Sequence, residues 1–312
     1  MPAADISQLD RPNAATEVIV ENGRQPVRLR IYPAAANEAK PRAEPRAGLV
    51  WVHGGGFAYG DLDMPEAHRT AELFAARNIT VISVDYRLCQ GGTAFPAPSD
   101  DVLAAWKWTT RHAGHLGIDQ DRLILGGASA GGNLAAGAVL RLLESSVEEL
   151  PRGLFLAYPT LHAIQPPTPD DIKELLARLE NPSVFSAPNV LDMYLNYLGG
   201  PIADAPAAAI PGIARIDQLR GFPPTIMINS EADELRVSGE AFAAVLQAAG
   251  TRVDTFTEQG TEHGHLNHPG EVSAVRSVER VKEWLTQLTG TSHEAPVSSH
   301  PTPPSASNTS LT

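Results

Sequence analysis

LILGGASAGGNL, residues 123–134, is the part of the chain that says most about its fold. It begins with three aliphatic residues typical of a buried strand, places four glycines around one serine, and runs into a helix-forming sequence over 130–143. Gly127-Ala128-Ser129-Ala130-Gly131 matches the G-x-S-x-G pattern, in which a sharp turn presents the serine at the carboxyl end of a strand. The stretch therefore predicts a strand, a tight turn and a helix, with Ser129 as a candidate nucleophile.

Strand and helix patterns alternate on both sides of this stretch. Several strand-like runs are nearly continuous in Val, Ile and Leu, as expected for parallel strands covered on both faces. Expected strands are 17–20, 27–32, 49–53, 80–86, 123–127, 154–158, 225–229 and 252–256. Expected helices are 66–77 after Pro65, 100–111 with Ser99 as its N-cap, 130–143, 238–249 ending at Gly250, and 271–288. Eight strands with intervening helices predict a three-layer α/β/α architecture with a mostly parallel sheet.

One long connection interrupts the alternation. Residues 160–221 separate two expected strands and carry apolar residues at helical spacing, which indicates an inserted helical cap instead of a bare loop. The predicted organisation is an α/β core over 1–159 and 222–289, with the cap over 160–221. Residues 290–312 are rich in Ser, Thr and Pro and poor in large apolar residues, so they are predicted to form a disordered tail.

A second glycine motif, His53-Gly54-Gly55-Gly56, follows the expected strand 49–53. Consecutive glycines let a backbone turn its N–H groups toward an anion. Together with the N–H of Ala130, these groups would form an oxyanion hole for a tetrahedral intermediate.

A nucleophilic serine needs a base, and the base needs a group that orients it. In the α/β-hydrolase fold the chain order is serine, acid, histidine. After strand 225–229 come Glu231, Asp233 and Glu234, and after strand 252–256 come His263, His265 and His268. We expect His263 as general base and Asp233 as its orienting acid, with Glu231 as the next candidate acid.

The motifs together resemble the hormone-sensitive-lipase family of esterases, which includes arylacetamide deacetylases and many bacterial carboxylesterases. The resemblance rests on HGGG at 53–56, DYRL at 85–88, GGASAGGN at 126–133, ADELR at 232–236 and EHGH at 262–265. It implies an α/β-hydrolase fold, an oxyanion hole formed by Gly54, Gly55 and Ala130, and a cap over the acyl or alcohol pocket. Candidate pocket residues are Phe57, Leu191, Tyr194, Leu195 and His265.

Three features depart from the family pattern. Ala128 stands where the family usually has Asp or Glu before the serine, and activity is expected to survive this change. His265 replaces a frequent Phe and is expected to alter a pocket wall. About fifteen residues precede the first expected strand, which predicts a more open site than in members with a longer N-terminal cap segment.

Composition and charge narrow the set of partners. The 312 residues carry a net charge of −12 and no basic run, which argues against nucleic acid and anionic membranes as partners. No stretch is apolar enough to span a membrane, and no secretion signal is evident, so a cytoplasmic protein is expected. The single cysteine, Cys89, is expected to be structural, and no metal or other cofactor is predicted. A homodimer is among the assemblies that the sequence leaves open.

The expected function is that of a serine carboxylesterase acting on small esters with short-to-medium acyl chains. An amidase, deacetylase or lactonase with the same triad is the alternative, because these enzymes share acyl-enzyme chemistry. A non-catalytic small-ligand receptor is the alternative from another class. Such receptors, as in the plant gibberellin receptors that resemble this family, lack the triad histidine, whereas His263 is present here. A lyase is disfavoured because the serine motif is intact and no additional base is evident.

Overall fold

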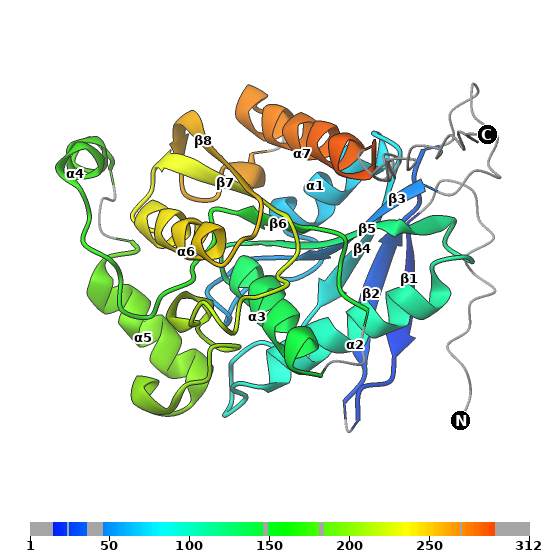
Figure 1. Cartoon of the computed structure of the whole chain (residues 1–312), viewed down its shortest axis with the longest axis horizontal. Helices are drawn as coiled ribbons and strands as arrows, with labels where there is room; N and C mark the ends of the chain where they lie inside the picture. Colours follow the sequence, from blue (N-terminus) through cyan, green and yellow to red (C-terminus); the bar gives the residue numbers. More distant parts are fainter. Residues whose placement is uncertain are drawn as a thin grey trace, which may run out of the picture.

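A single eight-stranded sheet forms the centre of the molecule (Figure 1). The computed structural model describes residues 15–23, 25–35, 46–145, 149–180, 184–268 and 270–290. The strands follow the order β1-β2-β4-β3-β5-β6-β7-β8; β2 pairs antiparallel with both β1 and β4, and all the other pairs are parallel. Their bounds are β1 Thr16–Val20, β2 Val27–Tyr32, β3 Arg46–Val52, β4 Ile79–Asp85, β5 Ile118–Ala128, β6 Leu154–Ala157, β7 Thr225–Ala232 and β8 Val253–Glu262.

Helices cover both faces of this sheet. In Figure 1, α1 and α7 lie above the sheet and α2 and α3 lie below it, and α1 and α7 also contact each other. The helices of the core are α1 Pro65–Ala75, α2 Ala97–His112, α3 Ala130–Ser145, α6 Arg236–Ala248 and α7 Val272–Gly290, with a short 3-10 helix, η4, at His265–Asn267. The α/β-hydrolase architecture with a mostly parallel sheet is therefore confirmed.

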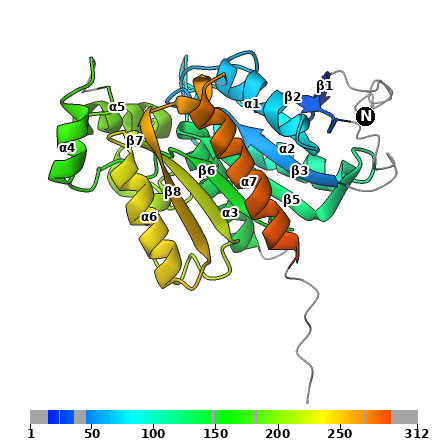
Figure 2. The same ribbon diagram turned by 90° about the horizontal axis from the view of Figure 1, so that it is seen from above.

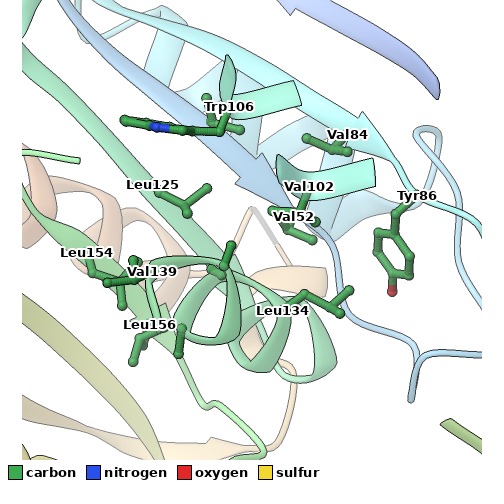
Figure 3. Packing of buried hydrophobic residues seen from close by; sticks show 14 of the residues in the cluster. Val52, Val84, Tyr86, Val102, Trp106, Leu125, Leu134, Val139, Leu154 and Leu156 are labelled. Atoms are coloured by element: carbon green, nitrogen blue, oxygen red, sulfur yellow. The ribbon is translucent and has the colours of Figure 1, made fainter. Parts of the chain in front are cut away.

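Alternation of side chains along each strand creates two separate apolar layers. In β3, Val50 and Val52 point into the layer between the sheet and helices α2 and α3. Leu49 and Trp51 point into the layer between the sheet and helices α1 and α7. Successive residues of a strand face opposite sides, so a strand in a sheet covered on both faces needs an apolar residue at nearly every position. Figure 3 shows the first layer, where side chains from β3, β5 and β6 interdigitate with side chains of α2 and α3.

The described residues of the segment expected to form the cap, 160–180 and 184–221, include the α-helices α4 (Asp170–Leu176) and α5 (Ala187–Leu198) and the 3-10 helices η2 (Ile202–Asp204) and η3 (Pro211–Ile213). This helical content is as predicted. Both α-helices lie at the end of the molecule opposite β1 and β2, as Figures 1 and 2 agree. This segment, called the cap below after its predicted role, therefore lies at the β7–β8 end of the strand order (Figure 1).

All eight expected strands are present, and the differences concern their limits. Strand β5 starts at Ile118, five residues earlier than expected, and β8 continues to Glu262. Ser99 is not an N-cap, because α2 begins at Ala97 after Pro96; its hydroxyl instead accepts a hydrogen bond from Arg141 Nη1 at 2.9 Å. The predicted tail, beyond the end of α7 at Gly290, lies outside the described residues.

Candidate active site

Ser129 occupies the sharp turn between β5 and α3. Its φ of +52° lies in the left-handed region, which a non-glycine residue adopts only where the surroundings enforce it. Here the crossing is tight, because a side chain at Gly131 would overlap the backbone carbonyls of Val52 and His53. The motif thus allows α3 to pass directly beside the end of β3 while the serine side chain projects from the turn.

Asp233 and His263 directly follow the last residues of β7 and β8, which pair at Ala232 and Glu262. His263 Nδ1 lies 2.7 Å from Asp233 Oδ2, and His263 Nε2 lies 3.0 Å from Ser129 Oγ. An ionised carboxylate only accepts hydrogen bonds, so Nδ1–H donates to Asp233 and Nε2 is left to accept the serine proton. The structure brings the three predicted residues into one hydrogen-bonded chain.

Burial holds this chain in place. The Asp233 side chain is buried, and its second oxygen accepts the N–H of Leu235 at 2.8 Å. Glu231, the other candidate acid, points elsewhere and accepts the N–H of Gly260 at 2.7 Å. Glu234 accepts the N–H of Phe185 at 2.7 Å, and burial raises the pKa of Glu234. Asp233 is therefore the acid that contacts the histidine.

In the candidate oxyanion loop, residues 53–60, the prediction that Gly54 is an oxyanion donor was wrong. The N–H of Gly54 donates to the carboxylate of Glu66 at 2.6 Å, so it is not available to an oxyanion. Among the hydrogen bonds of the described residues, none uses the N–H of Gly55, Gly56 or Ala130. Ala130 is also the first residue of α3, where the helix dipole favours negative charge. The candidate oxyanion donors are therefore Gly55, Gly56 and Ala130.

The Gly55 position requires glycine for two reasons. Its φ is +103°, which L side chains rarely adopt, and a side chain there would overlap the carbonyl of Tyr59. That carbonyl lies close because the loop folds back on itself, with the N–H of Ala58 and the N–H of Tyr59 both donating to the Gly55 carbonyl. The loop is thus a compact turn in which the N–H groups of Gly55 and Gly56 stay unpaired.

His265 does not form a pocket wall, in contrast to the prediction. Its side chain is buried in the core, with Nδ1 2.9 Å from Ser230 Oγ and Nε2 2.9 Å from Ser277 Oγ. Burial, reinforced by the nearby His263 and Arg276, lowers the pKa of His265 to about 4. His265 is therefore a neutral structural histidine behind the site.

Phe57 and Tyr194 are also fully buried, so neither lines an open pocket. Phe57 stacks on Tyr197 with 3.9 Å between ring centroids. The Tyr194 hydroxyl donates to the carbonyl of Thr160 at 3.0 Å and accepts from Asn133 Nδ2 at 2.7 Å. Tyr194 therefore anchors α5 to α3, because a buried hydroxyl needs such partners.

Leu191 and Leu195, the other two candidates, are only partly covered on α5, and Leu195 is 40% exposed. A third residue of this helix lies nearer to the oxyanion loop. A methyl group placed on Gly56 would lie 3.3 Å from the Met193 sulfur. Met193 thus brings the cap into contact with the loop of candidate oxyanion donors.

Two aromatic rings contact the His263 imidazole. Phe185, from the cap, lies 4.2 Å away between ring centroids, and Tyr158, after β6, lies edge-on at 5.0 Å. A cavity of about 220 Å³ opens on the Phe185 side. Apolar residues of the segment 160–221 line one part of this cavity, and core residues that end or follow β7 and β8 line the rest: Leu176, Leu179, Val184, Phe185, Ala232, Asp233, Glu234, Glu262 and His263.

The cysteine of this chain lies away from the triad. Cys89 is buried, and burial raises the pKa of its thiol to about 11, which keeps it protonated and unreactive. Within the described residues, no cluster of three or more His, Cys, Asp or Glu side chains is arranged to hold a metal ion. No helix in the same ranges has the length and apolar character needed to cross a membrane.

Four residues at the site were not predicted: Glu66, Tyr158, Phe185 and Met193. Glu66 has the sequence signature of an exposed first-turn acid after Pro65, and nothing in the sequence indicates its burial. Tyr158 directly follows β6, so its place at the carboxyl end of a strand is the one signal that would have marked it.

The family model described as the alpha/beta hydrolase fold matches residues 49–267. The chain belongs to this family. Membership among the hormone-sensitive-lipase esterases, predicted from the motifs, is likewise confirmed. The matched range contains all three residues of the hydrogen-bonded chain and both glycine motifs of this α/β-hydrolase.

Individual relatives agree with this placement. The chain is 34% identical over 232 residues to carboxylesterase NlhH of Mycobacterium tuberculosis (strain CDC 1551 / Oshkosh), and the match spans 70% of this chain but 66% of that protein, just under two thirds of its length. A solved bacterial heroin esterase superposes with a TM-score of 0.73 at 30% identity, covering 88% of this chain and 84% of that one. Brefeldin A esterase, a bacterial homologue of human hormone-sensitive lipase, shares the fold with a TM-score of 0.76 at 24% identity, covering 93% and 81%.

Proposed function

We propose that this protein is a serine carboxylesterase that hydrolyses small esters through an acyl-enzyme intermediate. The observation that carries the proposal is the continuous chain from Asp233 through His263 to Ser129, with contacts of 2.7 and 3.0 Å. Unpaired N–H groups at Gly55 and Ala130 accompany it. A nucleophile, a base with a fixed tautomer and anion-binding donors are the components of acyl transfer.

In the first half of the reaction Ser129 Oγ attacks the ester carbonyl carbon, and its proton passes to His263 Nε2. The carbonyl oxygen becomes an oxyanion that accepts hydrogen bonds from the loop and from Ala130, while Asp233 stabilises the imidazolium. The bond from carbon to the alcohol oxygen then breaks. The alcohol leaves with the proton from His263, and an acyl group remains on Ser129.

In the second half a water molecule attacks the acyl carbon and gives a proton to His263 Nε2. A second oxyanion forms in the same position. Its collapse breaks the bond to Ser129 Oγ, which takes the proton back from His263. The carboxylic acid is released and the enzyme returns to its starting state.

The surroundings of the candidate oxyanion donors favour small substrates. The Met193 side chain packs against Gly56 and limits the space beside these donors. We therefore propose a preference for acyl chains of roughly C2 to C6. The likeness to a carboxylesterase and to a heroin esterase supports ester bonds as the substrate class.

The test is a panel of p-nitrophenyl esters from C2 to C12, accompanied by a p-nitroanilide and a lactone, with kcat/KM measured for each. The proposal expects the highest kcat/KM among the short esters and much lower values for the anilide and the lactone. An anilide or lactone turned over faster than every ester would replace the proposal with an amidase or lactonase. Binding without turnover of any of them would indicate a receptor.

A further inference from the structure

The Glu66 carboxylate is buried below the oxyanion loop, with 2% of the residue exposed. It accepts hydrogen bonds from the N–H of Gly54 at 2.6 Å, from the Tyr158 hydroxyl at 2.5 Å and from Asn267 Nδ2 at 3.3 Å. No ion pair among the described residues includes it. Burying a carboxylate is costly unless hydrogen bonds replace its water, so three donors directed at one acid indicate a specific role.

The first of these donors, Gly54, fixes the direction of the neighbouring N–H of Gly55, a candidate oxyanion donor. While its N–H is held by Glu66, its carbonyl accepts the Tyr86 hydroxyl at 2.9 Å and lies 2.8 Å from His53 Nδ1. That carbonyl and the N–H of Gly55 belong to one planar trans peptide group and point in opposite directions. Holding Gly54 on both sides therefore directs the N–H of Gly55 away from Tyr86.

The other two donors belong to segments that position His263. Tyr158 lies with its ring 5.0 Å from that of His263, and Asn267 is in η4, four residues after His263. Asn267 also accepts the backbone N–H of Glu66 through Oδ1 at 3.2 Å. Glu66 thus joins the oxyanion loop to the two segments that adjoin the base.

We propose that Glu66 is a positioning residue that keeps the N–H of Gly55 aligned with Ser129 and His263. The inference rests on the proposed function. Glu66 touches no reacting atom and acts only through Gly54, Tyr158 and Asn267. A carboxylate suits this role because all its lone pairs accept, whereas an amide at this position would direct an NH₂ group at another donor.

The test is Glu66→Gln, which preserves the size of the side chain, measured on p-nitrophenyl butyrate. Loss of alignment removes stabilisation that exists only in the transition state, so kcat should fall about 10-fold to 100-fold with KM little changed. Binding of a trifluoromethyl ketone, which forms a tetrahedral adduct with Ser129, should weaken by a similar factor. Binding of the corresponding methyl ketone should stay within about twofold, because it forms little adduct.

Two further variants separate positioning from general destabilisation. Tyr158→Phe should lower kcat in the same direction, and Glu66→Gln combined with Tyr158→Phe should cost less than the product of the two single losses. Glu258→Gln is the matched control. Glu258, on the outer strand β8, is equally buried, but its carboxylate binds Arg276 and Arg280 of α7. Its replacement should lower the melting temperature and leave kcat of the folded enzyme unchanged.

The result that overturns the inference is a folded Glu66→Gln enzyme with wild-type kcat and wild-type affinity for the trifluoromethyl ketone. A fall in rate that only follows the folded fraction, as in Glu258→Gln, overturns it as well. If Glu66→Gln does not fold, Tyr158→Phe decides, and an unchanged kcat there counts against the inference. Wild-type enzyme without activity on any ester overturns the proposed function itself, which distinguishes the two failures.

Discussion

His263 Nε2 lies 3.0 Å from Ser129 Oγ, although 134 residues separate these two residues in the chain. The contact forms because β5 and β8 are parallel members of one sheet and both site residues follow the carboxyl ends of their strands. Parallel strands place all their carboxyl ends at one edge, where open α/β sheets bind ligands.

Ser129→Ala should abolish ester hydrolysis and leave the fold intact. The hydroxyl is the group that attacks, and removing a triad nucleophile costs about 10⁴-fold or more in kcat. The measurement is kcat/KM for p-nitrophenyl butyrate together with the circular dichroism spectrum. Ser145→Ala, at the other end of the same helix, is the control and should retain wild-type activity. More than about 1% residual activity in Ser129→Ala would contradict the nucleophile assignment.

Asp233→Asn should lower kcat by about 10³-fold to 10⁴-fold, because an amide no longer holds the productive histidine tautomer. Glu231→Gln should leave kcat within about twofold, since Glu231 contacts the N–H of Gly260 instead of His263. Steady-state kinetics of both variants distinguish the two candidate acids. The assignment of Asp233 would be wrong if Glu231→Gln were the more damaging change.

Met193→Ala should shift the acyl-chain preference toward longer esters. The Met193 side chain packs beside Gly56 in the oxyanion loop, so shortening it enlarges the space next to the acyl carbon. Each additional methylene that becomes buried should raise relative kcat/KM about fourfold. Leu195→Ala, an exposed position on the same helix, should leave the profile unchanged. Equal losses for C2 and C8 esters in Met193→Ala would show that Met193 only supports the structure.

The stability of the protein should fall as the pH is lowered from about 6.5 to about 4, partly because of His265. Its pKa is about 4 when folded and near 6.5 when unfolded. Between these values the unfolded chain binds a proton that the folded chain does not, so stability decreases toward acid pH. Above about pH 6.5 both states are neutral at this position, and His265 adds no pH dependence.

His265→Gln tests this contribution. Between pH 7 and 4.5 the variant should lose about 2 to 3 kcal/mol less unfolding free energy than the wild type. Urea unfolding at several pH values gives the comparison. Burial also lowers the pKa of His53 and His162, but both are present in wild type and variant, so the difference isolates His265. Parallel pH profiles for the two proteins would refute the prediction.

Most of the fold was predictable because its signals are local. Strands buried on both faces need apolar residues at nearly every position, so the central strands were visible as continuous Val, Ile and Leu runs. The end of β8 was missed because its last residues, TEQGTE over 257–262, are polar and paired only through tertiary contacts. Ser99 was misplaced as a cap because capping propensity is weaker than the constraint that Pro96 and the packing of α2 impose.

The triad was predictable for a related reason. Each of its members directly follows a strand, and the order serine, acid, histidine is a property of the fold. By contrast, three of the five predicted pocket residues, Phe57, Tyr194 and His265, were wrong because they are buried in the core, whereas Leu191 and Leu195 stay predictions. Tyr194 and His265 are residue types that often line pockets, but here their polar atoms form hydrogen bonds inside the core.

Residue periodicity and motifs within a few residues were enough to predict the strands, the helices, the tight turn at Ser129 and the identity of the triad. Which N–H groups of the glycine motif stay free to donate to an oxyanion depends on contacts between segments that are far apart in the chain. Gly54 and Gly55 look equivalent in HGGG, yet Glu66, brought in by α1, binds the N–H of Gly54 and leaves that of Gly55 unpaired. A hydrogen bond depends on distances of a few tenths of an ångström between segments, and such distances are set by packing and not by spacing along the chain.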